Sequence, residues 1–183
     1  MGRARCTVAM AALVLAVSAA CGGGGGGGGG GPTQPPPPRV SFTPVTGGAT
    51  SVSLIQGTGT TETTLFLEVR ANQVTDLYGL SFDLTYPTGV VTYRRVVEGP
   101  FLAQAASTSL QVAEPSPGRL IIGHSRLGPA GGISGSGLLM TLELAVAGTG
   151  TGAMTFQNQQ AFDPSGTPRI GYSWLGGTVR VGS

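Results

Sequence analysis

Strict alternation of apolar and polar residues marks one stretch of the chain, residues 77–86. Its apolar members are Tyr78, Leu80, Phe82, Leu84 and Tyr86, and its polar or small members are Gly79, Ser81, Asp83 and Thr85. Successive side chains of a strand point to opposite faces, whereas a helix would spread these apolar residues around its circumference. The stretch therefore predicts a β-strand with one buried face and one face in water.

Eight further stretches have strand patterns, and turns rich in glycine, proline and serine separate them. The segment 90–97 follows the turn at residues 87–89, so we expect it to pair with the alternating strand. Only residues 99–106 could form a helical turn. The pattern predicts a single all-β sandwich of about nine strands. The eight other predicted strands are 40–42, 51–55, 65–70, 90–97, 120–122, 138–146, 154–156 and 177–181.

The first twenty residues have the features of a secretory signal peptide. Arg3 and Arg5 precede a short apolar segment, residues 8–17. That segment is too short to cross a bilayer, which takes roughly 20 apolar residues. Small residues then lead to Cys21, as in the signal of bacterial lipoproteins, in which lipid is attached to the cysteine. The alternative is an ordinary signal peptide cleaved near Ala20. Both interpretations predict an exported protein.

A low-complexity linker follows Cys21. Residues 22–31 are all glycine and residues 35–38 are all proline. Polyglycine is expected to be a flexible coil and polyproline an extended spacer, and neither can bury apolar surface. We therefore expect residues 21–38 to be a lipid anchor and linker, and residues 39–183 to be the folded domain, held at the cell envelope or cell surface.

Charge and cysteine content exclude several functions. All ten basic residues are arginine; removal of Arg3 and Arg5 with the signal leaves eight, which balance the eight acidic residues. No basic stripe is visible, so we expect no nucleic-acid partner. The two cysteines are Cys6 and Cys21, so the predicted domain has no disulfide and no thiol-based metal site.

No sequence motif indicates an enzyme, a metal site or a cofactor. The segment 123–127, Gly-His-Ser-Arg-Leu, lacks the second glycine of a nucleophile elbow and is not followed by a helix. The acidic residues are scattered over different predicted strands, and Asp163 begins a turn. The residues alone therefore predict no catalytic site.

Four segments together resemble cohesin domains: residues 74–87, 96–102, 118–128 and 135–142. The resemblance covers almost the whole predicted domain. It implies a nine-stranded jelly-roll sandwich that binds dockerin modules of polysaccharide-degrading enzymes through one flat sheet face. Two features depart from the family pattern: Pro87-Thr88 replaces the expected Asp-Pro, and a single domain stands on a lipid linker.

The resemblance also indicates candidate site residues. The outward residues Gly79, Ser81 and Asp83 would meet a protein partner, together with His124 and Arg126, whose facing the sequence leaves open. The alternative is that these are only solvated strand residues. Two other functions remain open: a carbohydrate-binding module that uses Tyr172 and Trp174, or a structural surface lipoprotein without a ligand. Because Trp174 is the only tryptophan, its burial in the core is the favoured interpretation.

Overall fold

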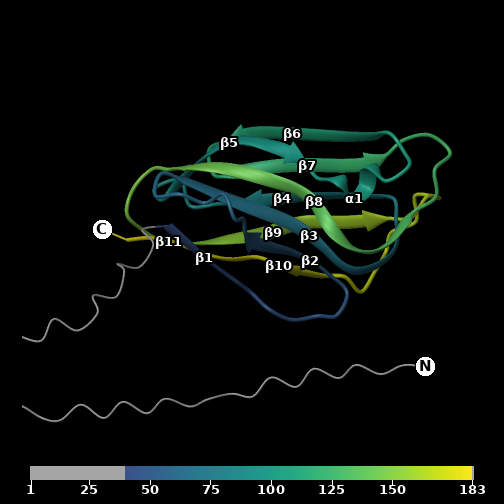
Figure 1. The fold of residues 1–183 in the computed structure, drawn as a ribbon, viewed down its shortest axis with the longest axis horizontal. Coiled ribbons are helices and arrows are strands. Elements are labelled where there is room, and N and C mark those ends of the chain that lie inside the picture. Colours follow the sequence, from purple (N-terminus) through teal and green to yellow (C-terminus); the bar gives the residue numbers. More distant parts are fainter. Residues whose placement is uncertain (1–39, 183) are drawn as a thin grey trace, which may run out of the picture. The chain divides into compact units, whose positions relative to one another are not determined.

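Two β-sheets stacked face to face make up the part of the chain that the computed structural model describes, residues 40–182 (Figure 1). The predicted all-β sandwich is confirmed. The predicted signal peptide, Cys21 and the linker lie outside the described residues. Within residues 40–182 no helix is long and apolar enough to cross a membrane.

The first sheet has six strands in the order β1-β11-β9-β4-β7-β6, and each neighbouring pair is antiparallel. The alternating stretch found in the sequence supplies β4, which lies between β9 and β7. This sheet carries the candidate site. Its strands are β1 (Val40–Pro44), β11 (Gly177–Val181), β9 (Gly150–Phe162), β4 (Gly79–Thr85), β7 (Arg119–Arg126) and β6 (Thr108–Ser116).

The second sheet has five strands in the order β10-β2-β3-β8-β5. Its pairs are antiparallel except β10 with β2, which is parallel. The one helix of the described residues, α1 (Pro100–Ala103), connects β5 to β6. The strands are β10 (Ser173–Leu175), β2 (Ser51–Gln56), β3 (Thr64–Leu77), β8 (Ile133–Val146) and β5 (Val91–Glu98).

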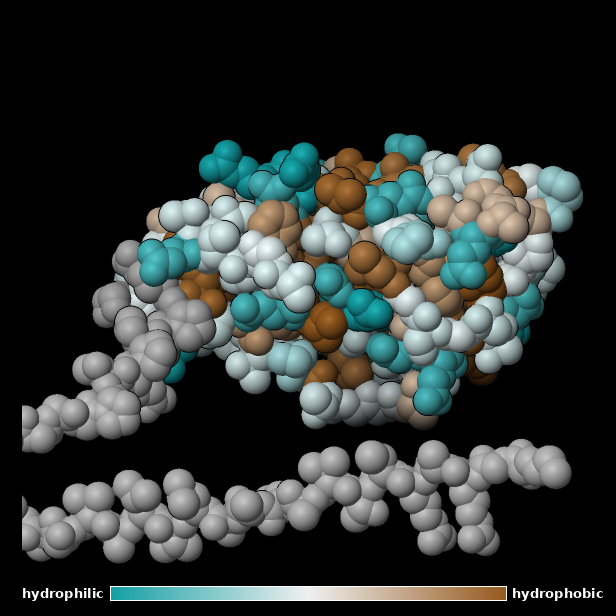
Figure 2. Space-filling view, viewed as in Figure 1, coloured by the Kyte–Doolittle hydropathy of each residue, from teal (hydrophilic) through white to brown (hydrophobic). Residues whose placement is uncertain are grey.

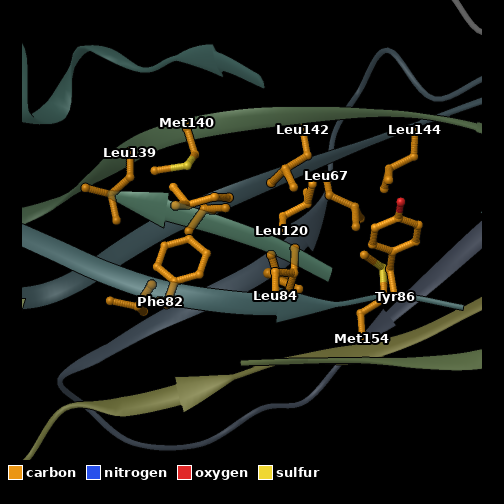
Figure 3. Packing of buried hydrophobic residues seen from close by; sticks show 14 of the residues in the cluster. Leu67, Phe82, Leu84, Tyr86, Leu120, Leu139, Met140, Leu142, Leu144 and Met154 are labelled. Carbon is orange, nitrogen blue, oxygen red and sulfur yellow. The ribbon is translucent and has the colours of Figure 1, made fainter. Parts of the chain in front are cut away.

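The core fills the space between the sheets, and β4 supplies its centre. Leu80, Phe82 and Leu84 are each at most 3% exposed. Phe82 and Leu84 point toward β8, whose leucines and Met140 face them from the other sheet (Figure 3). Burying each large side chain contributes roughly 1.5–3 kcal/mol to folding. The period-two pattern is therefore confirmed within β4 and sets the inner and outer faces of its sheet. Tyr78, predicted on the buried face, instead precedes β4 and is only half-buried, and its hydroxyl donates to Gly128 O.

Two details of the predicted sandwich are wrong. The domain has eleven strands rather than nine, because the sequence analysis missed β6, an edge strand whose inner residues are only partly buried, and β10, which has three residues. The segment after the turn at Pro87 also does not pair with β4. Its strand β5 crosses to the other sheet and pairs with β8.

Candidate functional site

The outer face of the six-stranded sheet, on the side away from the core, is where the predicted partner-binding residues of β4 point. Register places Ser81 beside Gly123 of β7, which in turn lies beside Gln111 of β6. Uncharged side chains, more than half of them small, occupy most positions of this face. We call the following set the outer face: Gly79, Ser81, Asp83, Ser109, Gln111, Ala113, Arg119, Ile121, Gly123, Ser125, Gln157 and Gln160.

Asp83 is the one carboxylate of the outer face, and its charge is neutralised. Its Oδ2 accepts hydrogen bonds from Asn158 Nδ2 at 2.7 Å and from Arg119 Nη2 at 2.7 Å and Nε at 3.1 Å. The amide of Asn158, followed by the guanidinium of Arg119, holds the pKa of Asp83 below its usual value despite burial. Asp83 is only 5% exposed, so it is a buried structural carboxylate rather than a free charge offered to a partner.

A hollow of about 480 Å³ opens on the outer face. Its floor is Gly79, Gly123 and Ser125, and Tyr78 and Gln111 stand beside them. Gly123 leaves the most space, since a Cβ built there would meet no atom within 4 Å. The hollow therefore exists because glycine stands at positions where other strand residues would project into it.

The loop of residues 163–166 borders this hollow on one side. Asp163 orders the loop, because its Oδ1 accepts hydrogen bonds from Ser165 Oγ at 2.6 Å and from the N–H groups of Ser165 and Thr167 at 2.9 Å. The Ser165 hydroxyl, followed by these backbone groups, lowers the pKa of Asp163. The predicted turn at Asp163 is confirmed, and it gives the hollow a fixed edge.

His124 and Arg126 lie on the inner side of β7, so we no longer assign them to the partner surface. They share the parity of Leu120 and Ile122 and are 1% and 5% exposed. Arg126 donates from Nη1 to Leu102 O at 2.5 Å and from Nη2 to Gln104 O at 2.9 Å. Arg126 therefore holds α1 and the residue after it against the inner side of β7.

His124 joins the two sheets through Glu98, the last residue of β5. His124 Nε2 lies 3.0 Å from Glu98 Oε1, which also accepts a hydrogen bond from Thr108 Oγ1. Burial lowers the pKa of His124, and the Thr108 hydroxyl, ahead of His124 itself, lowers the pKa of Glu98. Since an ionised carboxylate only accepts, the neutral imidazole donates its Nε2–H to Glu98.

Tyr172 and Trp174 lie away from the outer face. The Trp174 ring packs at centroid distances of 5.7 Å from Phe82 and 5.4 Å from Phe156, so it contacts the core. The Tyr172 hydroxyl donates to Thr75 O at 3.0 Å. Both residues also line a second hollow instead of forming a flat aromatic face.

Ser109 and Gln111 of the outer face were missed by the sequence analysis, because β6 was not predicted. A signal was present: Leu110 and Val112 alternate with polar or small residues in the same way as in β4, over a shorter stretch.

Among residues 40–182, no group of three or more histidine, cysteine or acidic side chains is placed to hold a metal ion.

The surface in Figure 2 intermixes apolar and polar residues across the whole face that the view presents. Exposed apolar residues of the described chain are dispersed over several elements, among them Ile121 of β7, Val97 of β5 and Ile170 of the loop before β10. Isolated exposed apolar residues are normal on proteins, so hydrophobicity alone does not mark a binding surface here.

Comparison with solved structures finds cohesins. Cohesin A11 of type II from Bacteroides cellulosolvens has a TM-score of 0.59 and 13% identity, over 74% of this chain and 100% of the cohesin. A non-cellulosomal cohesin from the archaeon Archaeoglobus fulgidus has a TM-score of 0.54 and 19% identity, over 79% and 91%. A type II cohesin-X-dockerin complex from Acetivibrio cellulolyticus has a TM-score of 0.57 and 14% identity, over 68% of this chain and 94% of the matched chain.

Sequence comparisons add nothing to this result, since no family model and no curated protein matches the chain. Identities below 25% in the structural matches show a shared fold and do not carry over a partner. The sandwich of residues 40–182 has the cohesin fold.

Proposed function

We propose that the protein is a non-catalytic binding module whose outer face docks a protein partner of the dockerin type. The observation that carries the proposal is the outer face itself, a neutral sheet surface of small side chains with a hollow over Gly123. Such a surface lets a partner backbone or helix approach closely, while serine and glutamine side chains supply hydrogen bonds that orient it. The solved cohesin-X-dockerin complex has the same fold on its cohesin side.

Neutralisation of Asp83 favours a partner recognised by shape and hydrogen bonding rather than by charge. Arg119 and Asn158 occupy the carboxylate, so the centre of the outer face offers no free negative charge. Long-range electrostatic steering would then contribute little to the association rate. We therefore expect binding that depends only weakly on ionic strength.

We also propose that the module is exported and held at the cell envelope by lipid on Cys21. The small residues before Cys21 and the glycine and proline linker after it support this proposal. In this arrangement the linker holds the domain away from the membrane, and a dockerin-bearing, polysaccharide-degrading enzyme is the partner that it recruits. Association with polysaccharide would then pass through the partner.

A bulky residue at Gly123 tests the docking surface. The Gly123 backbone is not in the left-handed region and a Cβ there meets nothing, so Gly123→Tyr should fold normally and fill the hollow. The full chain serves as bait in extracts of the source organism, with and without calcium, and bound proteins are identified by mass spectrometry. We expect a dockerin-bearing protein in the wild-type eluate and at least a tenfold loss, about 1.4 kcal/mol, for the variant.

The matched control is Gly131→Tyr, which also replaces a glycine whose Cβ would meet no atom but lies outside the outer face. It should retain the partner as the wild type does. Equal retention by Gly123→Tyr, or recovery of background proteins alone from every bait, would contradict the proposal.

A further inference from the structure

A second hollow, of about 330 Å³, lies along the free edge of β9. Strand β11 pairs with β9 only from Gly150 to Met154. Beyond Met154, no other strand of the described residues pairs with β9 on the side opposite β4, and an isolated antiparallel bridge joins only its last residue, Phe162, to Pro168. The loop of residues 168–172 stands over this edge, anchored where Arg169 N donates to Ala161 O at 2.7 Å. The hollow is a cleft lined by this edge, by the loop and by Trp174.

A β-bulge shapes the β9 side of this cleft. The register of β9 against β4 shifts between Gln157 and Gln160, and Asn158 has a φ of 49°, in the left-handed region. The hydrogen bond from Asn158 Nδ2 to buried Asp83 holds this conformation. Bulges re-aim side chains and are frequent beside functional sites.

Two consecutive glutamines line the cleft next to this bulge. Gln159, Gln160 and Ala161 all border the hollow, because it lies against the edge of the strand, and both glutamines are exposed. Each amide supplies a carbonyl acceptor and an N–H₂ donor. The two glutamines thus bring donors and acceptors to one wall of the cleft.

The opposite wall is aromatic and apolar. Trp174 packs on Phe82 and Phe156, which holds its ring in place while part of it stays accessible. Tyr172 is fixed by its hydroxyl, which donates to Thr75 O. At the loop tip, Ile170 is 91% exposed, an unusual state for a large aliphatic residue. Rigid aromatic rings with a polar edge suit ligands that have both apolar and hydrogen-bonding faces.

The cleft carries almost no free charge. Arg169 is the only charged residue among those that line it. Its guanidinium already donates from Nη2 and Nε to Thr75 O, at 2.9 and 3.3 Å, and lies 4.0 Å from Asp76 Oδ2. The Arg169 guanidinium is therefore already engaged and is a poor partner for an anionic ligand. No carboxylate lines the cleft to pair with a cationic ligand.

We propose that this cleft binds a neutral oligosaccharide, with sugar hydroxyls on Gln159 and Gln160 and a sugar face against the accessible part of Trp174 and Tyr172. A hollow of this size lies at the small end of ligand sites. A third hollow, also of about 330 Å³, is lined by residues 168–172 together with Thr50 and Thr75. The site shares Gln160 with the margin of the outer face but lies away from the hollow over Gly123. It would bind polysaccharide directly, in addition to any association through the protein partner.

The sole tryptophan of the chain, Trp174, makes its fluorescence a specific probe of this cleft. The purified full chain is titrated with cellohexaose, xylohexaose, maltohexaose and chitohexaose as neutral probes, and with oligogalacturonate as an anionic probe. We expect a saturable change with at least one neutral probe. The double variant Gln159→Ala/Gln160→Ala, at two exposed positions, should weaken that binding at least tenfold.

Gln111→Ala is the matched control, since it removes an exposed glutamine from the outer face, and it should bind the sugar as the wild type does. Gly123→Tyr should also bind normally, so loss of protein docking and loss of sugar binding are separable. Three results would each overturn the proposal: no saturable change with any neutral probe, a response to oligogalacturonate alone, or unchanged binding by the double glutamine variant.

Discussion

Buried ionisable side chains at the α1 end of the sandwich connect elements rather than contact solvent. Arg126 donates to carbonyl groups of Leu102 and Gln104, and His124 donates to Glu98 across the two sheets. Truncating one partner of such a bond leaves a buried polar group unsatisfied, which costs about 1–3 kcal/mol. These side chains therefore stabilise the junction between β5, α1 and β7.

Acidification should destabilise the fold through His124, the only histidine of the chain. Its pKa is ordinarily about 6.5 and is lowered by burial in the folded state. Below about pH 6.5, His124 therefore binds a proton more readily in the unfolded chain than in the folded chain. As a result, the free energy of unfolding falls as the pH falls. Glu98, whose folded pKa is also lowered, adds a further loss as the pH drops below about 4.5.

Urea unfolding between about pH 7.5 and about pH 5.5 measures this effect. His124→Gln keeps an N–H donor for Glu98 but cannot titrate, so its stability should be nearly constant over that range. The decline below about pH 4.5 should remain in the variant, because Glu98 still titrates. If the free energy of unfolding changed with pH in the same way for the wild type and the variant between about pH 5.5 and about pH 7.5, the assignment to His124 would be wrong.

The burial of a single residue was predictable where the period-two alternation along its strand decides which face its side chain lies on. Leu80, Phe82 and Leu84 face inward as expected, and the parity of His124 with Ile122 already allowed an inward position. Asp83 was predicted on the outer face of the sheet, and the register of β4 places it there, opposite Ile121 and Gln157. Its burial was not predictable, because the residues that cover it, Arg119 and Asn158, are 36 and 75 positions away in the chain.

Elements were predictable in proportion to their length and burial. The long strands β3 and β8 carry strong alternation and were found, although both extend beyond the predicted bounds. The short β10 has three residues and no periodic signal. The partner of β5 was missed for another reason: pairing after a turn is a tendency, and here the chain crosses between sheets.

The crossing between β10 and β11 depends on Gly176. A Cβ at this position would lie 2.1 Å from Met154 O, a backbone atom of β9 that cannot move alone. Gly176→Ala should therefore lower the free energy of unfolding by about 1–3 kcal/mol, as overpacking does in tight sites. Urea denaturation of the purified chain measures the difference.

Gly131→Ala is the control for this substitution, because a Cβ there meets no atom within 4 Å. Its stability should equal that of the wild type or exceed it by up to about 1 kcal/mol through lower entropy of the unfolded chain. Similar losses in the two variants would show that the close approach to Met154 is relieved by movement of the loop.

At the scale of the whole molecule, the sandwich was predictable because it depends on alternation, which many sequences satisfy. This explains how identities of 13–19% accompany TM-scores above 0.5 in the cohesin matches. The hollow of the outer face and the cleft at the edge of β9 could not be predicted. Each is formed by residues that register and loop conformation bring together, such as Gly123 with Asp163 or Gln160 with Trp174.

Anchoring is the property of the whole molecule that the proposed function most depends on. Cys21→Ser should move the protein from the membrane fraction to the soluble fraction, because serine cannot accept the thioether-linked lipid. Cell fractionation followed by immunoblotting measures the distribution. Cys6→Ser, inside the predicted signal peptide, is the matched control and should leave fractionation unchanged. Membrane association that survives Cys21→Ser would argue against lipidation.

The position of β1 at the edge of the six-stranded sheet has a mechanical consequence. A pull applied through the N-terminal end of the domain enters at β1 and reaches β4 and β7 by crossing β11 and β9. Backbone hydrogen bonds run across a sheet, so they carry this load together with the buried side chains of Val40 and Phe42. The pairing of β1 with β11 spans only five residue pairs. Under tension β1 would peel away first, which lengthens the attachment while the sheet that bears the outer face stays folded.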